Sequence, residues 1–258
     1  MRPEADVTES AGLVFERGTV HRLRLSVDYF DTRKSGELDY LDAQDVVTYE
    51  QWLPGRVTRA APEPGDPYGA GPVTFVLTGN INSAWRHSRD WSTALDYTWT
   101  ACAGGTLQVY ARWLHFQEWK RELVSNAPVI DELDAPDTSG LDLVPNRINF
   151  GASWTKARWG FGWDGRYFSP RVLPAELWAD QGSDRIGSYC PIGAYAKGDA
   201  SRLVPWKAKR FRLTAQLRVD NLFSAGLPRF PDNPNGTGVE PYGDWRGQAY
   251  SLSVTASY

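Results

Sequence analysis

The sequence predicts an all-β protein, an antiparallel transmembrane β-barrel segment of about nine strands. Three observations lead to this prediction. Apolar and polar residues alternate with a period of two in many stretches of the chain. These stretches run for about nine to twelve residues, longer than most strands of soluble sheets. The connections between them are very unequal in length.

The carboxyl-terminal stretch shows the alternation most strictly. Apolar residues occupy every second position and end on an aromatic residue, and serine or threonine residues separate them. A strand of about ten residues with one apolar and one small polar face matches a tilted membrane strand. An edge strand of a soluble sheet has the same pattern, and the terminal aromatic favours the membrane interpretation. The apolar positions are Tyr250, Leu252, Val254, Ala256 and Tyr258.

The same alternation predicts six further strands. Their ranges are 21–31, 91–100, 106–117, 147–155, 159–167 and 211–220. Residues 32–82 are expected to leave the sheet, with a short helix at 42–49 and a Pro- and Gly-rich stretch at 61–72. No strand is assigned between 186 and 207, because Pro191 has no N–H to donate to a strand ladder.

Short and long connections alternate along the chain. Residues 101–105 and 156–158 form tight turns, whereas three other connections are long and rich in Pro, Gly, Asp and Asn. Outer-membrane barrels combine short periplasmic turns with long extracellular loops. If Tyr258 lies at the periplasmic end, every long connection falls on the extracellular side. These long connections are 119–146, 169–185 and 221–246.

Composition excludes several classes of protein. The 258-residue chain has a net charge of −3, so no basic field attracts nucleic acid. No apolar run reaches the length of a transmembrane helix, which excludes a helical membrane protein. The 12 Trp, 12 Tyr and 10 Phe suit aromatic girdles at two membrane interfaces, or a carbohydrate-binding surface. The first ten residues carry no apolar core of a signal peptide.

The carboxyl end resembles that of TonB-dependent outer-membrane receptors. Asp220-Asn-Leu-Phe223 follows an alternating strand, and a Pro-bearing loop, Tyr242 and the stretch Arg246 to Tyr250 lead into the terminal strand. Tyr258 stands where the family usually has Phe, and the order Arg246-Gly-Gln-Ala-Tyr250 departs from its usual Gly-Arg-x-Tyr. Upstream, three stretches resemble the middle of the same barrels, so that the resemblance extends from about Leu13 onward. They are Leu25–Asp31, Arg56–Arg59 and Asn82.

The resemblance implies a larger barrel of about 22 strands with an amino-terminal plug domain. Residues 1–258 are therefore expected to be the carboxyl-terminal part of the β-barrel, about nine to ten of its strands, with the plug domain and the signal peptide absent from this chain. The implied location is the Gram-negative cell outer membrane. The implied function is energy-coupled uptake of a scarce nutrient, such as a siderophore, a vitamin or a glycan.

The same resemblance implies the partners. They are outer-membrane lipid, the barrel-assembly machinery that would read the terminal strand, a small-molecule or glycan substrate, and TonB acting through the plug of the parent receptor. No nucleic-acid partner is expected. Trp178 and Trp245, both in long loops, are expected to stack on a ligand ring or to anchor at the lipid interface.

A soluble β-sandwich that binds carbohydrate through its Trp residues is the alternative fold and function. The two interpretations differ in what covers the apolar faces of the strands. A sandwich buries them in a core shared with a second sheet. The barrel exposes them to lipid, and the residues expected to face lipid are Leu23, Leu95, Leu213 and Leu252.

No enzyme is predicted, and no catalytic, cofactor or metal residues are assigned. The three histidines, His21, His87 and His115, lie on separate elements without metal-ligand spacing. Glu132, Asp134 and Asp137 are the candidates for an acidic pair that cleaves glycosidic bonds. We expect them to be solvated loop residues instead.

Two further groups of side chains have expected positions. Cys102 and Cys190 are expected at opposite ends of the strands and therefore unbonded. Polar residues on the inward face of the strands are expected to hydrogen-bond to the plug or to one another. They are Gln108, Arg112, Arg166, Arg212, Gln216, Arg218 and Asp220.

Overall fold

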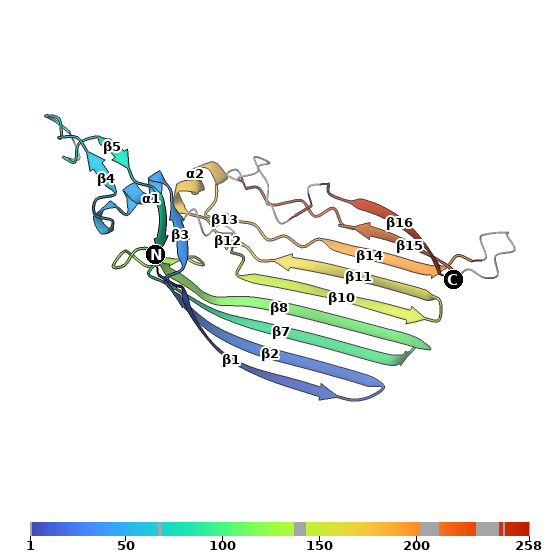
Figure 1. Cartoon of the computed structure of the whole chain (residues 1–258). Coiled ribbons are helices and arrows are strands. Elements are labelled where there is room, and N and C mark those ends of the chain that lie inside the picture. Colours follow the sequence, from blue (N-terminus) through green and yellow to red (C-terminus); the bar gives the residue numbers. More distant parts are fainter. Residues whose placement is uncertain are drawn as a thin grey trace.

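One antiparallel sheet dominates the computed structural model, which describes residues 2–66, 69–136, 143–201, 212–230, 243–244 and 246–257 (Figure 1). The strands lie side by side in chain order, and β9 (Ile130–Asp131) pairs only with β8. The predicted all-β class and a sheet of nine to ten strands are confirmed. The nine strands are β1 (Ala5–Arg17), β2 (His21–Ser35), β7 (Trp85–Cys102), β8 (Gly105–Glu122), β10 (Asn146–Lys156), β11 (Trp159–Phe168), β14 (Ile192–Asp199), β15 (Arg212–Asp220) and β16 (Ala249–Ser257).

All seven strands predicted from the alternation are present. Several extend beyond the predicted ranges, above all β7 and β8, which have 18 residues each. Two of the nine strands of the main sheet were not predicted. β1 pairs along its whole length with β2, and β14 begins directly after Pro191, so that this proline precedes the ladder instead of interrupting it.

The connections differ at the two ends of the sheet, as predicted. Tight turns at 18–20, 103–104 and 157–158 join neighbouring strands at one end, where the chain also reaches Ser257. Ala103 and Ala157 adopt the left-handed conformation with φ of 49° and 51°. The long connections 36–84, 123–145, 169–191 and 221–248 gather at the other end, called the long-connection end (Figure 1). Most of the connection between β14 and β15 lies outside the described residues.

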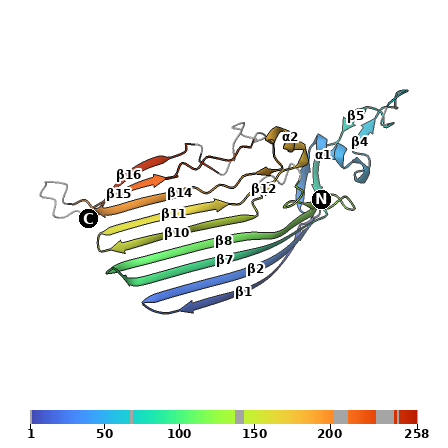
Figure 2. The ribbon, with the colours of Figure 1, turned by 180° about the vertical axis from the view of Figure 1, so that it is seen from behind.

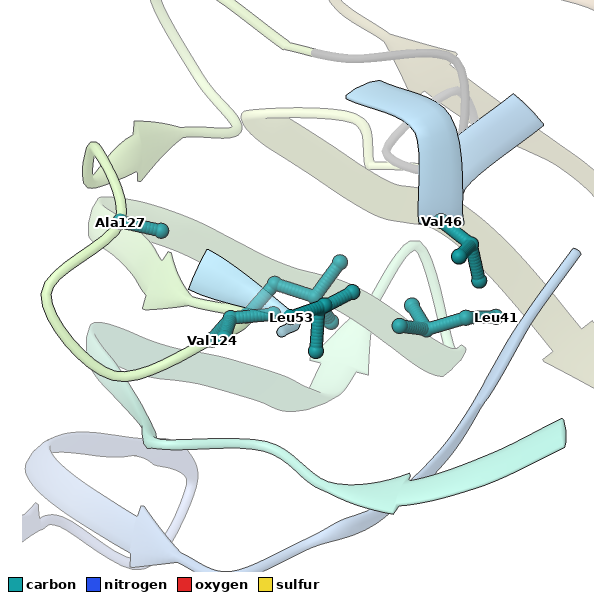
Figure 3. Packing of buried hydrophobic residues seen from close by; sticks show 6 residues of the cluster. Leu41, Val46, Leu53, Val124 and Ala127 are labelled. Atoms are coloured by element: carbon teal, nitrogen blue, oxygen red, sulfur yellow. The ribbon is translucent and has the colours of Figure 1, made fainter. Parts of the chain in front are cut away.

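The connection between β2 and β7 folds into a small unit of its own. The predicted short helix is present and begins with a capping box, in which the Asp42 carboxylate accepts from the Asp45 N–H at 2.9 Å. Leu41, Val46 and Leu53 pack against Val124 and Ala127 of the next connection (Figure 3). Its elements are β3 (Leu38–Leu41), α1 (Ala43–Thr48), η1 (Glu50–Trp52), β4 (Val57–Arg59), β5 (Val73–Val76) and β6 (Gly79–Asn82).

A second small core lies in the connection between β11 and β14. Leu173, Leu177 and Ile186 bury Phe230, which comes from the connection after β15. Two long connections are thereby fastened to each other. The elements here are β12 (Arg171–Val172), η2 (Ala175–Leu177), α2 (Trp178–Gln181) and β13 (Arg185–Ile186).

The main sheet is a single layer. Within the described residues no second sheet or helix packs on either of its faces (Figure 1 and Figure 2). The buried apolar side chains of these residues all lie outside its nine strands. Among the described residues, no helix combines the length and apolar character needed to cross a membrane.

One face of the sheet, here called the apolar face, carries a belt bounded by two rows of rings. Cross-strand pairing places Tyr29 opposite Trp91, with ring centroids 4.9 Å apart, in the row nearer the long-connection end. Eight residues along β2 and β7, His21 stacks on Trp99 at 5.1 Å in the other row, which continues to Trp154. Between the rows, the apolar face of four neighbouring strands has no charged side chain. The residues there are Leu23, Leu25, Val27, Thr93, Leu95, Tyr97, Val109, Ala111, Trp113, Ile148, Phe150 and Ala152.

Charged residues cover the apolar face as soon as the belt ends. The carboxylates of Asp31 and Glu118 are bridged by the guanidinium of Arg89, which lies 2.9 Å from an oxygen of each. His87 Nε2 lies 2.8 Å from Asp31, and Lys120 Nζ lies 3.3 Å from Glu118. The change from aliphatic to ionic side chains therefore falls within two residues of the aromatic row.

The opposite face, here called the polar face, holds side chains flat against the sheet. The Tyr195 ring lies over Gly162, where an added Cβ would come within 2.6 Å of a ring carbon. Arg218 lies across to Asp164, with two nitrogen–oxygen distances of 2.8 and 3.0 Å, and also contacts Asp220. This agrees with the expectation that the inward polar residues bond to one another. Of the other expected members, Arg112 pairs with Asp96, and the side chain of Arg212 lies outside the described residues.

Candidate ligand site at the long-connection end

A cavity of about 510 Å³ opens where the sheet forks. β8 pairs with β10 as far as His115 opposite Asn146, and beyond this point it pairs with β9 instead. The fork leaves a gap between β9 and the start of β10, and the connection after β11 closes this gap. The polar residues that line the cavity include Lys120, Asp131, Asp134, Ser169, Arg171 and Arg185.

The floor of the cavity is fixed by Asn146, the first residue of β10. Its backbone N–H donates to Ser169 Oγ at 3.0 Å. Its side-chain oxygen accepts from Trp113 Nε1 at 3.1 Å and lies 3.0 Å from His115 Nδ1. Pro145 and Pro170 flank these two residues and restrict the backbone on both sides. The start of β10 is therefore a rigid platform beneath two of the expected ligand loops.

One wall carries closely spaced opposite charges. Asp131 Oδ1 accepts from the backbone N–H of Leu133 at 3.1 Å, which closes a tight turn after β9. Lys120 Nζ lies 3.8 Å from Asp131 and 3.3 Å from Glu118. Across the cavity, the buried guanidinium of Arg171 lies 5.5 Å from the Phe230 ring centroid. With donors and acceptors of both signs, the cavity suits a polar ligand held by hydrogen bonds.

Two of the three expected ligand loops meet at this cavity. The lining comes from the connection after β8, which contains most of 119–146, and from the connection after β11, which contains 169–185. The third loop, 221–246, reaches the second core through Phe230. In its described part, Arg246 donates to Asp244, and these hydrogen bonds lower the pKa of Asp244 to about 2.

The expected ligand aromatics are only partly placed. Trp178 begins α2, and its indole N–H donates to the Leu173 carbonyl at 2.8 Å. The side chain is 46% exposed but does not line the cavity, so its polar atom serves the second core. Trp245 and Tyr258 lie outside the described residues. The other terminal-strand positions, Tyr250, Leu252, Val254 and Ala256, are exposed on β16.

Glu132 is not the solvated loop residue that the sequence led us to expect. Its carboxylate is buried and lies 2.6 Å from Arg121 Nε, and Arg121 also approaches Asp39 at 3.6 Å. The contact of Arg121 with Asp39 joins β8 to the small unit after β2. Asp137 lies outside the described residues.

The histidines and cysteines have separate surroundings. His21 Nδ1 lies 2.8 Å from the Tyr97 hydroxyl, whereas His87 and His115 contact the partners given above. Among the described residues, no three His, Cys, Asp or Glu side chains come together in a group that could hold a metal. Both cysteines are free thiols: Cys102 ends β7 at the tight-turn end, and Cys190 precedes β14 at the opposite end. Partial burial raises the pKa of the Cys190 thiol.

Three residues without a predicted role are brought together on the polar face by the strand register. Asp90 lies directly opposite Phe30 on β2 and Phe116 on β8. The predicted strand began at Trp91, so Asp90 was not assigned to any face. Extending the alternation back by one residue would have placed Asp90 on the polar face, opposite to Trp91. The chain matches no protein-family model and shows no significant similarity to curated proteins.

Proposed function

We propose that this chain is the carboxyl-terminal part of the barrel wall of a TonB-dependent outer-membrane receptor, which takes up a scarce nutrient. The proposal rests on the motifs around Asp220–Phe223 and in the terminal strand, and on the architecture of the sheet. In this function the chain supplies wall and ligand loops. Energy from TonB reaches the parent receptor through its plug domain.

The uncovered apolar belt is the observation that carries the proposal. The belt is part of an apolar face that no other described element covers. On the same face, Leu252 of β16 is 72% exposed and Leu13 of β1 is 79% exposed. Burying one such side chain stabilises a protein by roughly 1.5–3 kcal/mol. A belt left in water would lose this stabilisation at each of its apolar residues. Lipid is the cover that suits a smooth, continuous face bordered by aromatic rows.

The height of the belt agrees with this cover. Trp91 and Trp99 mark its two borders on β7 and lie eight residues apart. At about 3.3 Å per residue the borders are roughly 26 Å apart along the strand. A tilt of about 40° reduces this to roughly 20 Å along the membrane normal, near the ~25 Å apolar band of outer-membrane barrels.

The soluble carbohydrate-binding sandwich, the alternative, is less well supported. It requires a second sheet packed about 10 Å away, with the two inner faces sharing a core. In the part of the chain that the structure describes, the two small cores lie beyond the ends of the strands and no second sheet faces the first. Exposed Trp163 lies on the apolar face between Ala152 and Ala194, which are aliphatic and not polar neighbours.

A spin-label experiment on neighbouring residues tests the proposal. The full chain, with Cys102 and Cys190 replaced by Ser, is refolded into phosphatidylcholine vesicles with one nitroxide at Leu252 or at Ser253. These positions are adjacent and point to opposite faces of β16. We expect the label at Leu252 to collide more with oxygen, which partitions into lipid, and the label at Ser253 to collide more with a water-soluble nickel complex.

Two results would contradict the proposal. One is a chain that folds and stays soluble without lipid or detergent. The other is a pair of labels that both collide mainly with the nickel complex, since lipid then covers neither face. In lipid-free buffer, protection of the label at Leu252 together with free access of the nickel complex to the label at Ser253 would favour the sandwich.

A further inference from the structure

Asp90 occupies an unusual position on the polar face. Strand register places it directly between Phe30 and Phe116, one on each neighbouring strand. Side chains that are directly opposite in an antiparallel sheet have Cβ atoms about 4.5–5.5 Å apart and point to the same side. A carboxylate thus lies between two phenylalanine residues across the strands.

The described residues give the Asp90 carboxylate no hydrogen bond and no ion pair. Two other acidic residues of the polar face are neutralised within the sheet. Asp96 pairs with Arg112 at 2.6 Å, and Asp164 pairs with Arg218 at 2.8 Å. The half-buried Asp90 has only carbon on either side of it across the strands.

A β-bulge creates this arrangement. Arg89 pairs with Glu118 and Asp90 pairs with Phe116, so Gln117 is the extra residue on β8. The bulge turns Glu118 to the apolar face, where it bonds to Arg89, and leaves Phe116 beside Asp90. The bulge therefore places Glu118 and Phe116, which are two residues apart on β8, on opposite faces of the sheet.

The aromatic surface around Asp90 already holds one cation. The Phe116 ring meets Trp119 edge to face, with centroids 5.1 Å apart. The Arg86 guanidinium lies 5.9 Å from the Trp119 ring centroid and is neutralised by Glu37 at 3.1 Å. Among the described residues, no cation lies beside Asp90. Its carboxylate and the rings of Phe30 and Phe116 could nevertheless contact a cation as Glu37 and Trp119 contact Arg86.

We propose that Asp90, Phe30 and Phe116 form a recognition site for the alkylammonium or quaternary ammonium group of a small-molecule ligand. The carboxylate supplies the opposite charge, and the faces of the two rings supply cation–π attraction. Phe116 also lines the cavity at the fork of the sheet, so the site and the cavity share this residue. The inference names a substrate class for the proposed receptor and in that sense rests on the proposed function.

The test compares two probes of the same shape. Choline carries the quaternary ammonium group, and 3,3-dimethylbutan-1-ol is its neutral counterpart. The full chain is refolded in dodecyl maltoside, which has no choline headgroup, and binding is followed by ligand-observed NMR at constant ionic strength. We expect choline to bind saturably with a dissociation constant of roughly 1–10 mM. The neutral counterpart should bind at least about tenfold more weakly.

Variants assign the binding to this site. Asp90→Asn should weaken choline binding by at least about tenfold, and Phe116→Leu, which keeps apolar volume, by about threefold or more. Asp28→Asn is the matched control, because Asp28 lies on the same face opposite Gly12 and Ser92 without a neighbouring ring across the strands. It should bind choline like the parent chain. Circular dichroism in the same detergent confirms that each variant folds.

Several outcomes would overturn the inference. They are equal binding of the two probes, unchanged binding in Asp90→Asn, and no saturable binding of choline by the folded chain. Tighter binding of Nα-acetyl-lysine amide than of choline would assign the site to a protein lysine instead of a small ligand. Because the assay runs in detergent and needs no transport, its failure leaves the spin-label test of the proposed function intact.

Discussion

An arginine placed at the centre of the apolar belt should destabilise the protein only when the belt lies in a bilayer. Leu95 lies four residues from Trp91 and four from Trp99, which makes it the midpoint of the belt on β7. It is therefore roughly 13 Å along the strand from either border. With a tilt of about 40°, this is about 10 Å along the membrane normal, close to the midplane.

The expected cost of Leu95→Arg follows from this depth. An arginine on the lipid face of a barrel costs about 2–4 kcal/mol at the midplane and about 0–1 kcal/mol near the interface. The folding equilibrium in vesicles should therefore fall by roughly 30- to 700-fold. Thr93→Arg and Tyr97→Arg, each two residues nearer to a border, should give intermediate costs.

The control is Ser26→Arg. Ser26 follows Leu25, the direct cross-strand partner of Leu95, and points to the polar face. It tests the same height with the opposite orientation, and we expect a cost below about 1 kcal/mol. Unfolding by guanidinium chloride in phosphatidylcholine vesicles, followed by tryptophan fluorescence, measures all four variants. Equal costs for Leu95→Arg and Ser26→Arg, or a cost that does not vary with depth, would refute the reasoning.

Three further predictions concern other parts of the chain. The full 258-residue chain, exported to the outer membrane of cells that lack the parent receptor, should not restore nutrient uptake, and restored growth on the limiting nutrient would contradict the proposed role as wall. Leu41→Ala, at a buried position of the first small core, should lower stability there by about 2–5 kcal/mol in hydrogen exchange, whereas Leu38→Ala at an exposed position of the same strand should have little effect. Hydrogen bonds from Arg59 lower the pKa of Glu50, so the ion pair stabilises the fold above the ordinary pKa of a glutamate and this contribution is lost as the pH falls through the lowered value. Melting curves between pH 3 and 7 should show this loss in the parent chain and not in Glu50→Gln, and parallel curves would contradict the assignment.

The sheet was predictable because its strands have two different faces. A period of two over nine or more residues leaves little choice of structure, so ranges such as 91–100 and 159–167 were correct in their centres. The start of the first range was not, because β7 continues back into Trp85–Asp90, where charged residues replace apolar ones on the same face. The pattern changes there while the backbone hydrogen bonding continues.

The candidate site could not be predicted because it depends on contacts between distant segments. The cavity forms where β8 changes its pairing from β10 to β9, close to the bulge at Gln117. Nothing in the sequence of β8 marks that point. Glu132 gave a wrong expectation for the same reason. Its partner Arg121 lies on the preceding strand, and only the folded connection brings the two together.

The directions of β1 and β16 limit how this sheet can be completed. The sheet has nine strands, an odd number, so its two outermost strands run the same way, from the long-connection end toward the tight turns. Joining these edges to each other, or to the edges of a second copy inserted with the same orientation, would create a parallel pair. A wall that is antiparallel all the way round needs an odd number of strands from elsewhere. Complementation with such a segment should therefore succeed where self-association of this chain does not.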